Sequence, residues 1–445
     1  MRLLRGASGT LLALAAIGPH GAAQTPTLTT LYAFQGGTDG ANPRAGLAIG
    51  ANGALYGTTN IGGASDLGTV FALAPGTTGV TSWGEAVLYS FSGPDGENPQ
   101  AGLVIGPDGA PYGADQYGGA AGVVFKLIPP ASASEGWTET LLYSFTGGRD
   151  GGAPMGSLLV GSQGEVYGVT YGGGLSCSCG VVYQLTPPAP ASAEGTPWTE
   201  TVLYSFTGGS DGGYPRAGLT MGKDGILYGT TGSDGPSLKG TVFELTPPAS
   251  PGEAWTETVL YGFTGEHGDG QFPEAGLAIG KNGALYGTTS GGGGSCPISF
   301  ENWDGCGIVF ELTPSAAGGS WTENVIYRFH GFPDGGVPMG PLALGANGAI
   351  YGATEGGGTF GCYAGPFAQE PPGCGVVFQL TPPETAGAAW NERVLHGFQA
   401  AADGARPAGG VTLGADGTLY GTTSQNGKSQ KGTSGCCGTV FSLTP

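Results

Sequence analysis

Charged residues are scarce in this chain of 445 residues, and basic ones are scarcest. Only 11% of the residues are charged, and 14 Lys and Arg stand against 33 Asp and Glu, which leaves a formal net charge of −19. Such a surface repels phosphate groups, and no basic patch with interleaved aromatic residues counters it. We therefore expect neither nucleic acid nor an anionic membrane surface as a partner. Cations are the small partners that this charge favours.

Long apolar runs are also missing, apart from one near the N-terminus. Arg2 and Arg5 precede an apolar stretch over residues 11–17, and Gly21-Ala22-Ala23 follow. This order is that of an export signal, and the stretch is too short to span a bilayer. We predict a signal peptide over residues 1–23 and a single mature domain over 24–445. We expect this domain to be secreted or periplasmic, monomeric and without a membrane span.

Catalytic motifs are missing too. Beyond the predicted signal only His267, His330 and His396 occur, far apart in the chain and without a Ser or Cys nucleophile motif. No Gly-x-x-x-x-Gly-Lys-Ser/Thr loop that could hold a phosphate is present, and the Gly-rich runs lie between predicted strands. We therefore predict no catalytic residues.

Glycine, in contrast, is abundant, with 94 residues. No strict Gly-x-y period indicates collagen, and 39% apolar residues argue against disorder. A Tyr-Gly pair that follows a tight turn returns seven times, about sixty residues apart, which indicates a tandem repeat. The tyrosines are Tyr56, Tyr112, Tyr167, Tyr228, Tyr286, Tyr351 and Tyr420.

Each repeat predicts four short antiparallel strands. In the fourth repeat these strands cover residues 217–222, 226–231, 240–246 and 255–263. Asp224-Gly225, between the first two, suits a two-residue hairpin turn with positive φ angles. Four such strands form one blade of a β-propeller.

The two ends of the chain predict a closed ring. The last repeat stops after its third strand, and residues 28–34 match the missing fourth strand. If residues 28–34 complete the blade formed by 408–445, neither end leaves a bare sheet edge. We predict an all-β fold, a seven-bladed β-propeller with four antiparallel strands per blade, closed by its N-terminal strand. A parallel β-helix ranks second. Small residues that open each first strand, such as Ala217-Gly218, suit a crowded axis.

The repeated runs resemble a known family. Residues 52–59, 224–231 and 416–423 follow [Asp/Asn]-Gly-x-Leu-Tyr-Gly-Thr-Thr, and residues 68–75, 240–247 and 438–445 follow roughly Gly-Thr-Val-Phe-x-Leu-Thr-Pro. Both runs resemble the GloVer repeat of the choice-of-anchor tandem repeat GloVer-containing proteins. The resemblance implies bacterial export and, in many members, a C-terminal surface-sorting segment. No such segment follows Pro445, so we expect free secretion or a periplasmic location. The resemblance implies no catalytic residues.

An Asp-Gly-x-x-Pro motif connects successive blades. Loops after the second and fourth strands of a blade open on one face, where the binding residues of a rigid scaffold often lie. Asp suits an Asx-turn, Gly a positive φ, and Pro the start of a strand. The alternative is a ring of carboxylates that binds Ca²⁺. The aspartates are Asp39, Asp95, Asp150, Asp211, Asp269, Asp334 and Asp403.

The cysteines fall in loops between second and third strands, on the same predicted face. An even number in an exported protein predicts disulfides, and pairing within each loop is simplest. Two such pairs would fasten long insertions and two would close very small rings. A metal site is the alternative, although the spacing is not that of zinc ligands. The pairs are Cys177 and Cys179, Cys296 and Cys306, Cys362 and Cys374, and Cys436 and Cys437.

A Trp-x-Glu motif opens the fourth strand in six repeats. Its glutamates could be acid/base carboxylates, but the strand is outermost, so we expect Trp to pack at the rim and Glu to be solvated. The glutamates are Glu85, Glu139, Glu200, Glu257, Glu323 and Glu392.

Two loop insertions break the repeat and carry aromatic residues. Aromatic side chains held in disulfide-bounded loops suit stacking on sugars or gripping a peptide, and they could equally cover the insertion itself. The candidate ligand-binding residues are Phe300, Trp303, Asp304, Phe360, Tyr363 and Phe367.

The sequence therefore favours a secreted binding module that recognises a glycan or a protein through this face. Two alternatives stay open. One is a hydrolase or lyase that acts on polysaccharide, which rests on fold analogy alone. The other is a non-enzymatic surface or matrix structural protein.

Overall fold

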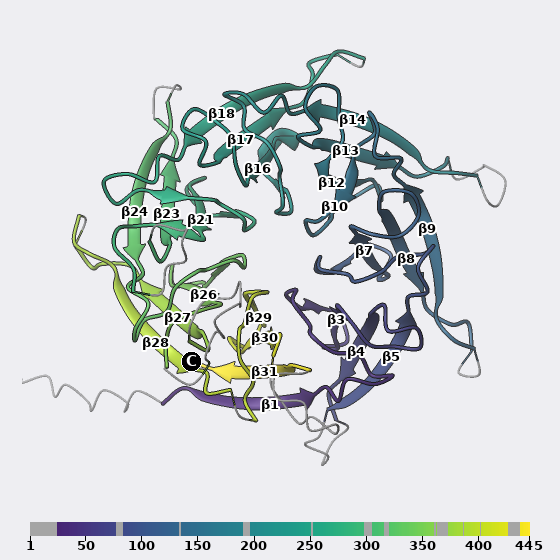
Figure 1. Cartoon of the computed structure of the whole chain (residues 1–445), viewed down its shortest axis with the longest axis horizontal. Coiled ribbons are helices and arrows are strands. Elements are labelled where there is room, and N and C mark those ends of the chain that lie inside the picture. Colours follow the sequence, from purple (N-terminus) through teal and green to yellow (C-terminus); the bar gives the residue numbers. More distant parts are fainter. Residues whose placement is uncertain are drawn as a thin grey trace, which may run out of the picture.

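The computed structural model describes residues 25–76, 83–132, 135–189, 196–250, 252–297, 305–315, 320–359, 362, 373–385, 387–400, 402–425 and 437–445. These residues form seven antiparallel sheets arranged as blades around one axis (Figure 1). The predicted seven-bladed β-propeller is confirmed. Within the described residues, no helix is long and apolar enough to cross a membrane.

Each blade has a short inner strand and three longer ones. Blade 1 has β2 (Ala48–Ile49), β3 (Leu55–Thr59), β4 (Thr69–Ala74) and β5 (Gly84–Ser90). Blade 2 has β6 (Val104–Ile105), β7 (Pro111–Asp115), β8 (Val123–Ile128) and β9 (Thr138–Ser144). Blade 3 has β11 (Leu159–Val160), β12 (Val166–Gly172), β13 (Val181–Thr186) and β14 (Thr199–Ser205), with β10 (Gly152–Pro154) beside β12.

The other blades repeat this order. Blade 4 has β15 (Thr220–Met221), the 3₁₀ turn η1 (Lys223–Gly225), β16 (Leu227–Thr231), β17 (Thr241–Thr246) and β18 (Thr256–Gly262). Blade 5 has β20 (Ala278–Ile279), β21 (Leu285–Thr289), β23 (Ile308–Thr313) and β24 (Thr322–Arg328), while β19 (Gly270–Gln271) pairs with β22 (Gly291–Gly292). Blade 6 has β25 (Ala343–Leu344), β26 (Ile350–Thr354), β27 (Val376–Thr381) and β28 (Asn391–Gly397).

Blade 7 is built from both ends of the chain. It contains β29 (Val411–Leu413), β30 (Leu419–Thr423) and β31 (Thr439–Thr444), and β1 (Thr27–Ala33) pairs antiparallel with β31 from Thr27–Thr444 to Ala33–Thr439. Figure 1 shows β1 in purple beside β31 in yellow, on the outside of the ring. The predicted closure by the N-terminal strand is therefore confirmed.

Aromatic pairs form the core of every blade junction. Phe34 of the closing strand meets Phe71 of blade 1 edge-on, with ring centroids 5.1 Å apart, and both side chains are fully buried. Burying one such ring contributes about 1.5–3 kcal/mol, and an edge-to-face pair adds roughly 0.5–1.5 kcal/mol. The same contact recurs at the other junctions, as Phe91–Phe125, Phe145–Tyr183, Phe206–Phe243, Phe263–Phe310, Phe329–Phe378 and Phe398–Phe441.

The inner strands are shorter than predicted. In blade 4 the strand expected over residues 217–222 is only β15, Thr220–Met221. The preceding small residues pack against the backbone of the neighbouring blade instead of pairing within their own sheet. A Cβ on Gly156 would lie 2.6 Å from the backbone nitrogen of Gly218 in the next blade, so the crowding expected at the axis is confirmed.

The turn between the first two strands also differs from the prediction. In blade 1 the Gly53 N–H donates to the Gly50 carbonyl and the Gly50 N–H to the Ala54 carbonyl, which is a three-residue loop with Gly53 at positive φ. The Asn52 side chain accepts the Ala54 N–H at 3.1 Å, so Asn52 acts through its side chain rather than through a positive φ. Only in blade 4 does the acidic turn residue, Asp224, take a positive φ itself.

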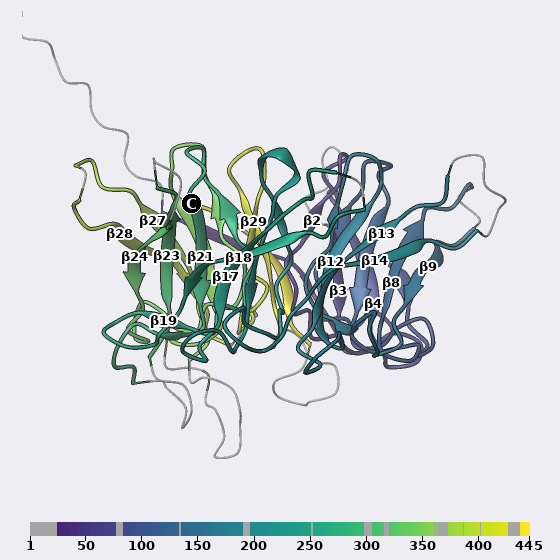
Figure 2. The same cartoon turned by 90° about the horizontal axis from the view of Figure 1, so that it is seen from above.

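The connections divide between two faces of the ring, as the strand order predicted. The turns between first and second strands lie on one face, here called the hairpin face. The loops after second and fourth strands lie on the other, the loop face, where bridges such as Ala41–Ile61 and Gly213–Ser233 join them. Figure 2 shows these two sets of connections at opposite edges of the ring.

Candidate functional site

The axis of the ring holds a cavity of about 340 Å³. Every blade contributes to its lining through the residues that lead into the inner strand. The small residues predicted at these positions, such as Ala45-Gly46 and Ala275-Gly276, form its wall. This cavity is the candidate binding site, and the connections of the loop face lead into its lining residues.

One lining position differs in chemistry from blade to blade. It is the residue directly after the proline of each Asp-Gly-x-x-Pro motif, and we call these seven residues the axial ring. In contrast to the flanking small residues, they include cationic, anionic, amide and thioether side chains. The axial ring consists of Arg44, Gln100, Met155, Arg216, Glu274, Met339 and Ala408.

The residue before each of these prolines holds the connection in an unusual backbone conformation. All seven have φ between +54° and +61°. This backbone conformation costs a residue with a side chain about 1–2 kcal/mol, and it is rarest for a β-branched residue such as Val337. Each N–H donates at 2.7–2.9 Å to a carbonyl just before the third strand of the preceding blade. These hydrogen bonds between blades help to fix the path of the backbone that leads to the axial ring residues. The seven residues are Asn42, Asn98, Ala153, Tyr214, Phe272, Val337 and Arg406.

Disulfides lie at several of these accepting carbonyls. Cys177–Cys179, Cys296–Cys306 and Cys362–Cys374 are bonded as predicted. Cys437 is also in a disulfide, while Cys436 lies outside the described residues. The carbonyl of Cys179 accepts the N–H of Tyr214, and that of Cys437 accepts the N–H of Asn42. Both arginines of the axial ring therefore follow a connection that is anchored on a cystine.

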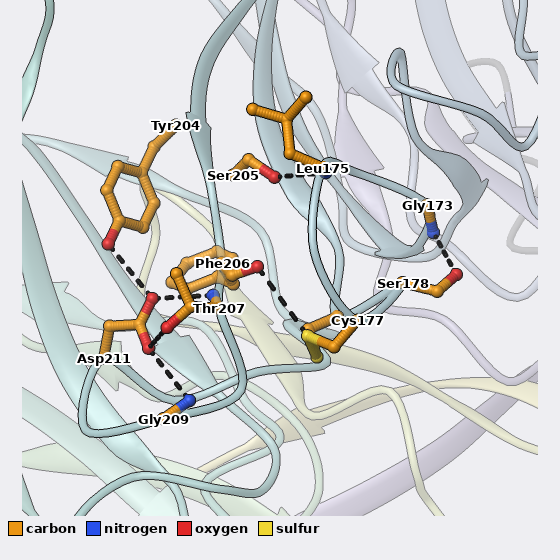
Figure 3. The surroundings of a disulfide bond; sticks show 11 residues. Gly173, Leu175, Cys177, Ser178, Tyr204, Ser205, Phe206, Thr207, Gly209 and Asp211 are labelled. Carbon is orange, nitrogen blue, oxygen red and sulfur yellow. Dashed lines mark hydrogen bonds between the residues drawn. A yellow bond between two sulfur atoms is a disulfide. The ribbon is translucent and has the colours of Figure 1, made fainter.

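The Cys177–Cys179 disulfide shows this arrangement (Figure 3). The Cys177 sulfur lies 3.9 Å from the carbonyl of Phe206, the residue directly after β14. Asp211, in the connection that follows, accepts hydrogen bonds from the Thr207 N–H at 2.8 Å and the Thr207 hydroxyl at 2.6 Å. It also accepts one from the Tyr204 hydroxyl at 3.0 Å. The disulfide and the aspartate thus hold the same connection from two sides.

The motif aspartates act as structural acceptors in all seven connections. Each accepts a backbone N–H from a residue three to five positions earlier. In six of them a tyrosine hydroxyl from the fourth strand is a second donor, and His396 takes that place at Asp403. Burial works against ionisation, but these hydrogen bonds lower the pKa of Asp95 and Asp211 below the ordinary value.

A metal site at these aspartates stays a prediction. Among the described residues, no group of three or more His, Cys, Asp and Glu side chains is close enough to hold a metal ion. The hydrogen bonds already described account for the repetition of the aspartates without Ca²⁺.

The Trp-x-Glu glutamates are not solvated as expected. Each has one carboxyl oxygen that is buried and without a hydrogen-bond partner. Each also faces the motif aspartate of the preceding blade, as Glu257 faces Asp211. Burial first, and then the negative charge of this aspartate, raise the pKa of all six glutamates to about 7. In blade 7 the corresponding residue is Leu28, which packs against the core between blades 6 and 7.

Arg216 and Glu274 form an ion pair in the axial ring. The Arg216 Nη1 and Glu274 Oε1 atoms lie 3.5 Å apart. The Arg216 guanidinium also stacks over the Tyr171 ring, 4.8 Å from its centroid, and donates to the Tyr171 hydroxyl at 3.4 Å. Tyr171 in turn contacts Tyr214, with ring centroids 5.1 Å apart. Arg216 is therefore fixed in place on the loop face by Glu274 and by Tyr171, which in turn packs on Tyr214.

Exposed apolar side chains occur on the loop face in four consecutive blades. Each lies in the loop between second and third strands, and exposure rises from 40% in blade 1 to 67% in blade 4. The four side chains are Ile61, Tyr117, Leu175 and Leu238. The six ligand-binding residues predicted in the insertions of blades 5 and 6, Phe300, Trp303, Asp304, Phe360, Tyr363 and Phe367, lie outside the described residues.

Sequence reasoning missed the axial ring, although a signal for it was present. The motif was recognised by its repeated residues, whereas the position after the proline attracted no notice because it does not repeat. The position after the proline varies within an otherwise constant repeat, and the fold places it at the axis. Such a position is where the blades can differ in function.

Solved structures that resemble this one share little sequence with it. A gluconolactonase from Xanthomonas campestris is 15% identical, with a TM-score of 0.40 over 73% of this chain and 85% of that chain. A putative oxidoreductase (glucose dehydrogenase) from Thermus thermophilus is 18% identical, with a TM-score of 0.39 over 94% and 99%. A protein of unknown function from Dyadobacter fermentans is 12% identical, with a TM-score of 0.41 over 94% and 99%. At these values the likeness bears on neither substrate nor activity.

Comparison by sequence identifies the family. No curated protein matches the chain. The model of the Gloeobacter/Verrucomicrobia repeat matches residues 7–135 and 84–300, which together cover more than half of the chain. The residues that suggested the GloVer repeat lie in the strands and turns of the blades. The chain therefore belongs to the Gloeobacter/Verrucomicrobia repeat family.

Proposed function

We propose that this protein is a binding module whose ligand, a glycan or a protein segment, docks on the loop face and reaches into the axial cavity. The observation that carries the proposal is the axial ring, in which seven equivalent positions present different side chains to one cavity. The backbone is the same at this position in every blade. A purely structural role therefore gives no reason for the side chain to differ among Arg, Gln, Glu, Met and Ala.

Three further features support this face. Its loops carry the exposed Leu175 and Leu238, which add apolar surface to the same face. Its connections are anchored by disulfides, so that a ligand would meet a preorganised surface. The disulfides, together with the predicted signal over residues 1–23, also support export to an oxidising compartment.

The proposal is tested with an array of glycans and peptides and one matched pair of variants in blade 7. Ala408→Trp places a large side chain in the axial ring, whereas Ala415→Trp places the same side chain in an exposed turn on the hairpin face. We expect Ala408→Trp to abolish binding of the array ligands and Ala415→Trp to leave it unchanged, with both variants melting like the wild type. Full binding by Ala408→Trp would overturn the proposal.

The same array, analysed for shortened products, tests the alternative of polysaccharide cleavage. Binding without product formation is the result we expect.

A further inference from the structure

The charge of the axial ring is opposite in sign to that of the whole chain. The chain carries a net charge of −19, but the ring contains Arg44, Arg216 and a single acid, Glu274. Arg44 is exposed and forms no ion pair or hydrogen bond within the described part of the chain. Its neighbours in the ring, Gln100 and Ala408, are uncharged. Arg44 is therefore an open cationic position at the cavity.

Glu274 is the buried counterpart of this open position. Its side chain is 11% exposed; one oxygen pairs with Arg216, and the other, Oε2, is buried and forms no hydrogen bond. The nearby Ser290 hydroxyl donates to the Phe272 carbonyl at 3.2 Å. Burial raises the pKa of Glu274, while Arg216 and then Ser290 oppose this. A ligand hydroxyl that donates to Oε2 would give this buried oxygen the partner that it lacks in the structure.

The rest of the ring is uncharged and partly apolar. Met155 and Met339 line the cavity with flexible thioethers, which adapt to irregular apolar surfaces. A volume of about 340 Å³ lies near the lower end of the roughly 300–1,000 Å³ of ligand pockets, so it suits the end of a chain rather than a long segment.

We infer that the axial cavity binds the carboxylate-bearing end of an acidic saccharide. Arg44 pairs with the carboxylate, Glu274 hydrogen-bonds a hydroxyl, and the methionines contact the apolar edge of the sugar ring. This inference rests on the proposed function, since it names the ligand class for the same cavity. A guanidinium binds a carboxylate through two parallel hydrogen bonds, which a neutral ester cannot accept equally well.

The test compares an acid with its ester and one arginine with another. Digalacturonate and its dimethyl ester are titrated into the wild type, Arg44→Gln and Arg149→Gln, a control arginine that is exposed elsewhere on the loop face. Loss of a charge-assisted hydrogen bond weakens binding about tenfold or more. We expect the acid to bind Arg44→Gln about tenfold or more weakly than it binds the wild type. On the wild type we expect the ester to bind more weakly than the acid by a similar factor. We expect Arg149→Gln to bind both ligands as the wild type does.

Other outcomes separate this inference from the function on which it rests. If Ala408→Trp abolishes binding of acid and ester while Arg44→Gln alters neither, the binding module stands and the carboxylate inference is overturned. If Ala408→Trp still binds every ligand of the wild type, the proposed function itself fails. A tripeptide with a free C-terminus that binds more tightly than digalacturonate would overturn the saccharide assignment.

Discussion

On the hairpin face the turns of the seven blades are nearly alike, whereas on the loop face the connections share a frame but differ in their side chains. The hairpin turns use one Asn, Asp or Gln beside a glycine, as in Asn52-Gly53, and little else. The loop connections keep Asp, Gly and Pro, and vary at the axial ring and in the loops beside it. The difference teaches that the repeat keeps the hairpin turns constant, whereas the loop connections vary around a constant frame.

Two glycines of blade 1 provide the strongest test of this comparison. A Cβ on Gly68, on the loop face, would lie 2.6 Å from Cδ of Pro99 in the next connection, whereas one on Gly53 would meet nothing within 4 Å. Both residues have positive φ. We expect Gly68→Ala to lower the free energy of unfolding by about 3–4 kcal/mol and Gly53→Ala by about 1 kcal/mol. Chemical denaturation of both variants measures this. Equal losses would show that the loop face is no more constrained than the hairpin face.

A pair of aspartates in blade 4 sharpens the comparison further. Asp211 is 8% exposed and accepts hydrogen bonds on both oxygens, whereas Asp224 lies exposed in the hairpin turn. Hydrogen bonds to a charged group contribute roughly 1.5–3 kcal/mol each, although not additively. We expect Asp211→Ala to lower the free energy of unfolding by about 3 kcal/mol and Asp224→Ala by under about 1 kcal/mol. Urea unfolding of the two variants checks the ratio; a larger loss for Asp224→Ala would refute it.

Some features of the ring could be predicted from the sequence, and others could not. Ring closure was predictable because residues 28–34 repeat the fourth-strand pattern that the last blade lacks, and pairing of β1 with β31 satisfies it. The glutamates such as Glu257 were wrongly expected in solvent. Their position in an outer strand does not reveal that the connection from the preceding blade brings Asp211 close. Arg216 and Glu274 are 58 residues apart, and only the curvature of the ring brings them together.

The junction glutamates predict a dependence of stability on pH. A pKa of about 7 in the folded state, against an ordinary 4.5, means that the folded protein holds protons between pH 4.5 and 7 that the unfolded chain releases. Stability therefore falls as pH rises through this window and is level above it. Below about pH 4 the protonation of Asp95 and Asp211, whose pKa values are lowered, removes stability again.

Thermal melting measures this effect, which is the smallest of the three because the glutamates are only half-buried. We expect the midpoint to be higher at pH 5 than at pH 8, and the slope to flatten when all six glutamates are replaced by Gln, which resembles the protonated form. A midpoint that rises from pH 5 to pH 8 would contradict the arrangement of Glu against Asp at the junctions. Because Leu28 replaces the glutamate between blades 6 and 7, that junction adds nothing to the slope.

The most direct measurement of the central claim is hydrogen exchange with and without the tightest ligand from the array. We expect slower exchange at the axial residues 44–47, 216–220 and 274–277 and in the neighbouring loops of the loop face. At the hairpin turns, for example residues 50–54, we expect no change. Slower exchange confined to the hairpin turns, with the axial residues unaffected, would contradict binding at the axial cavity.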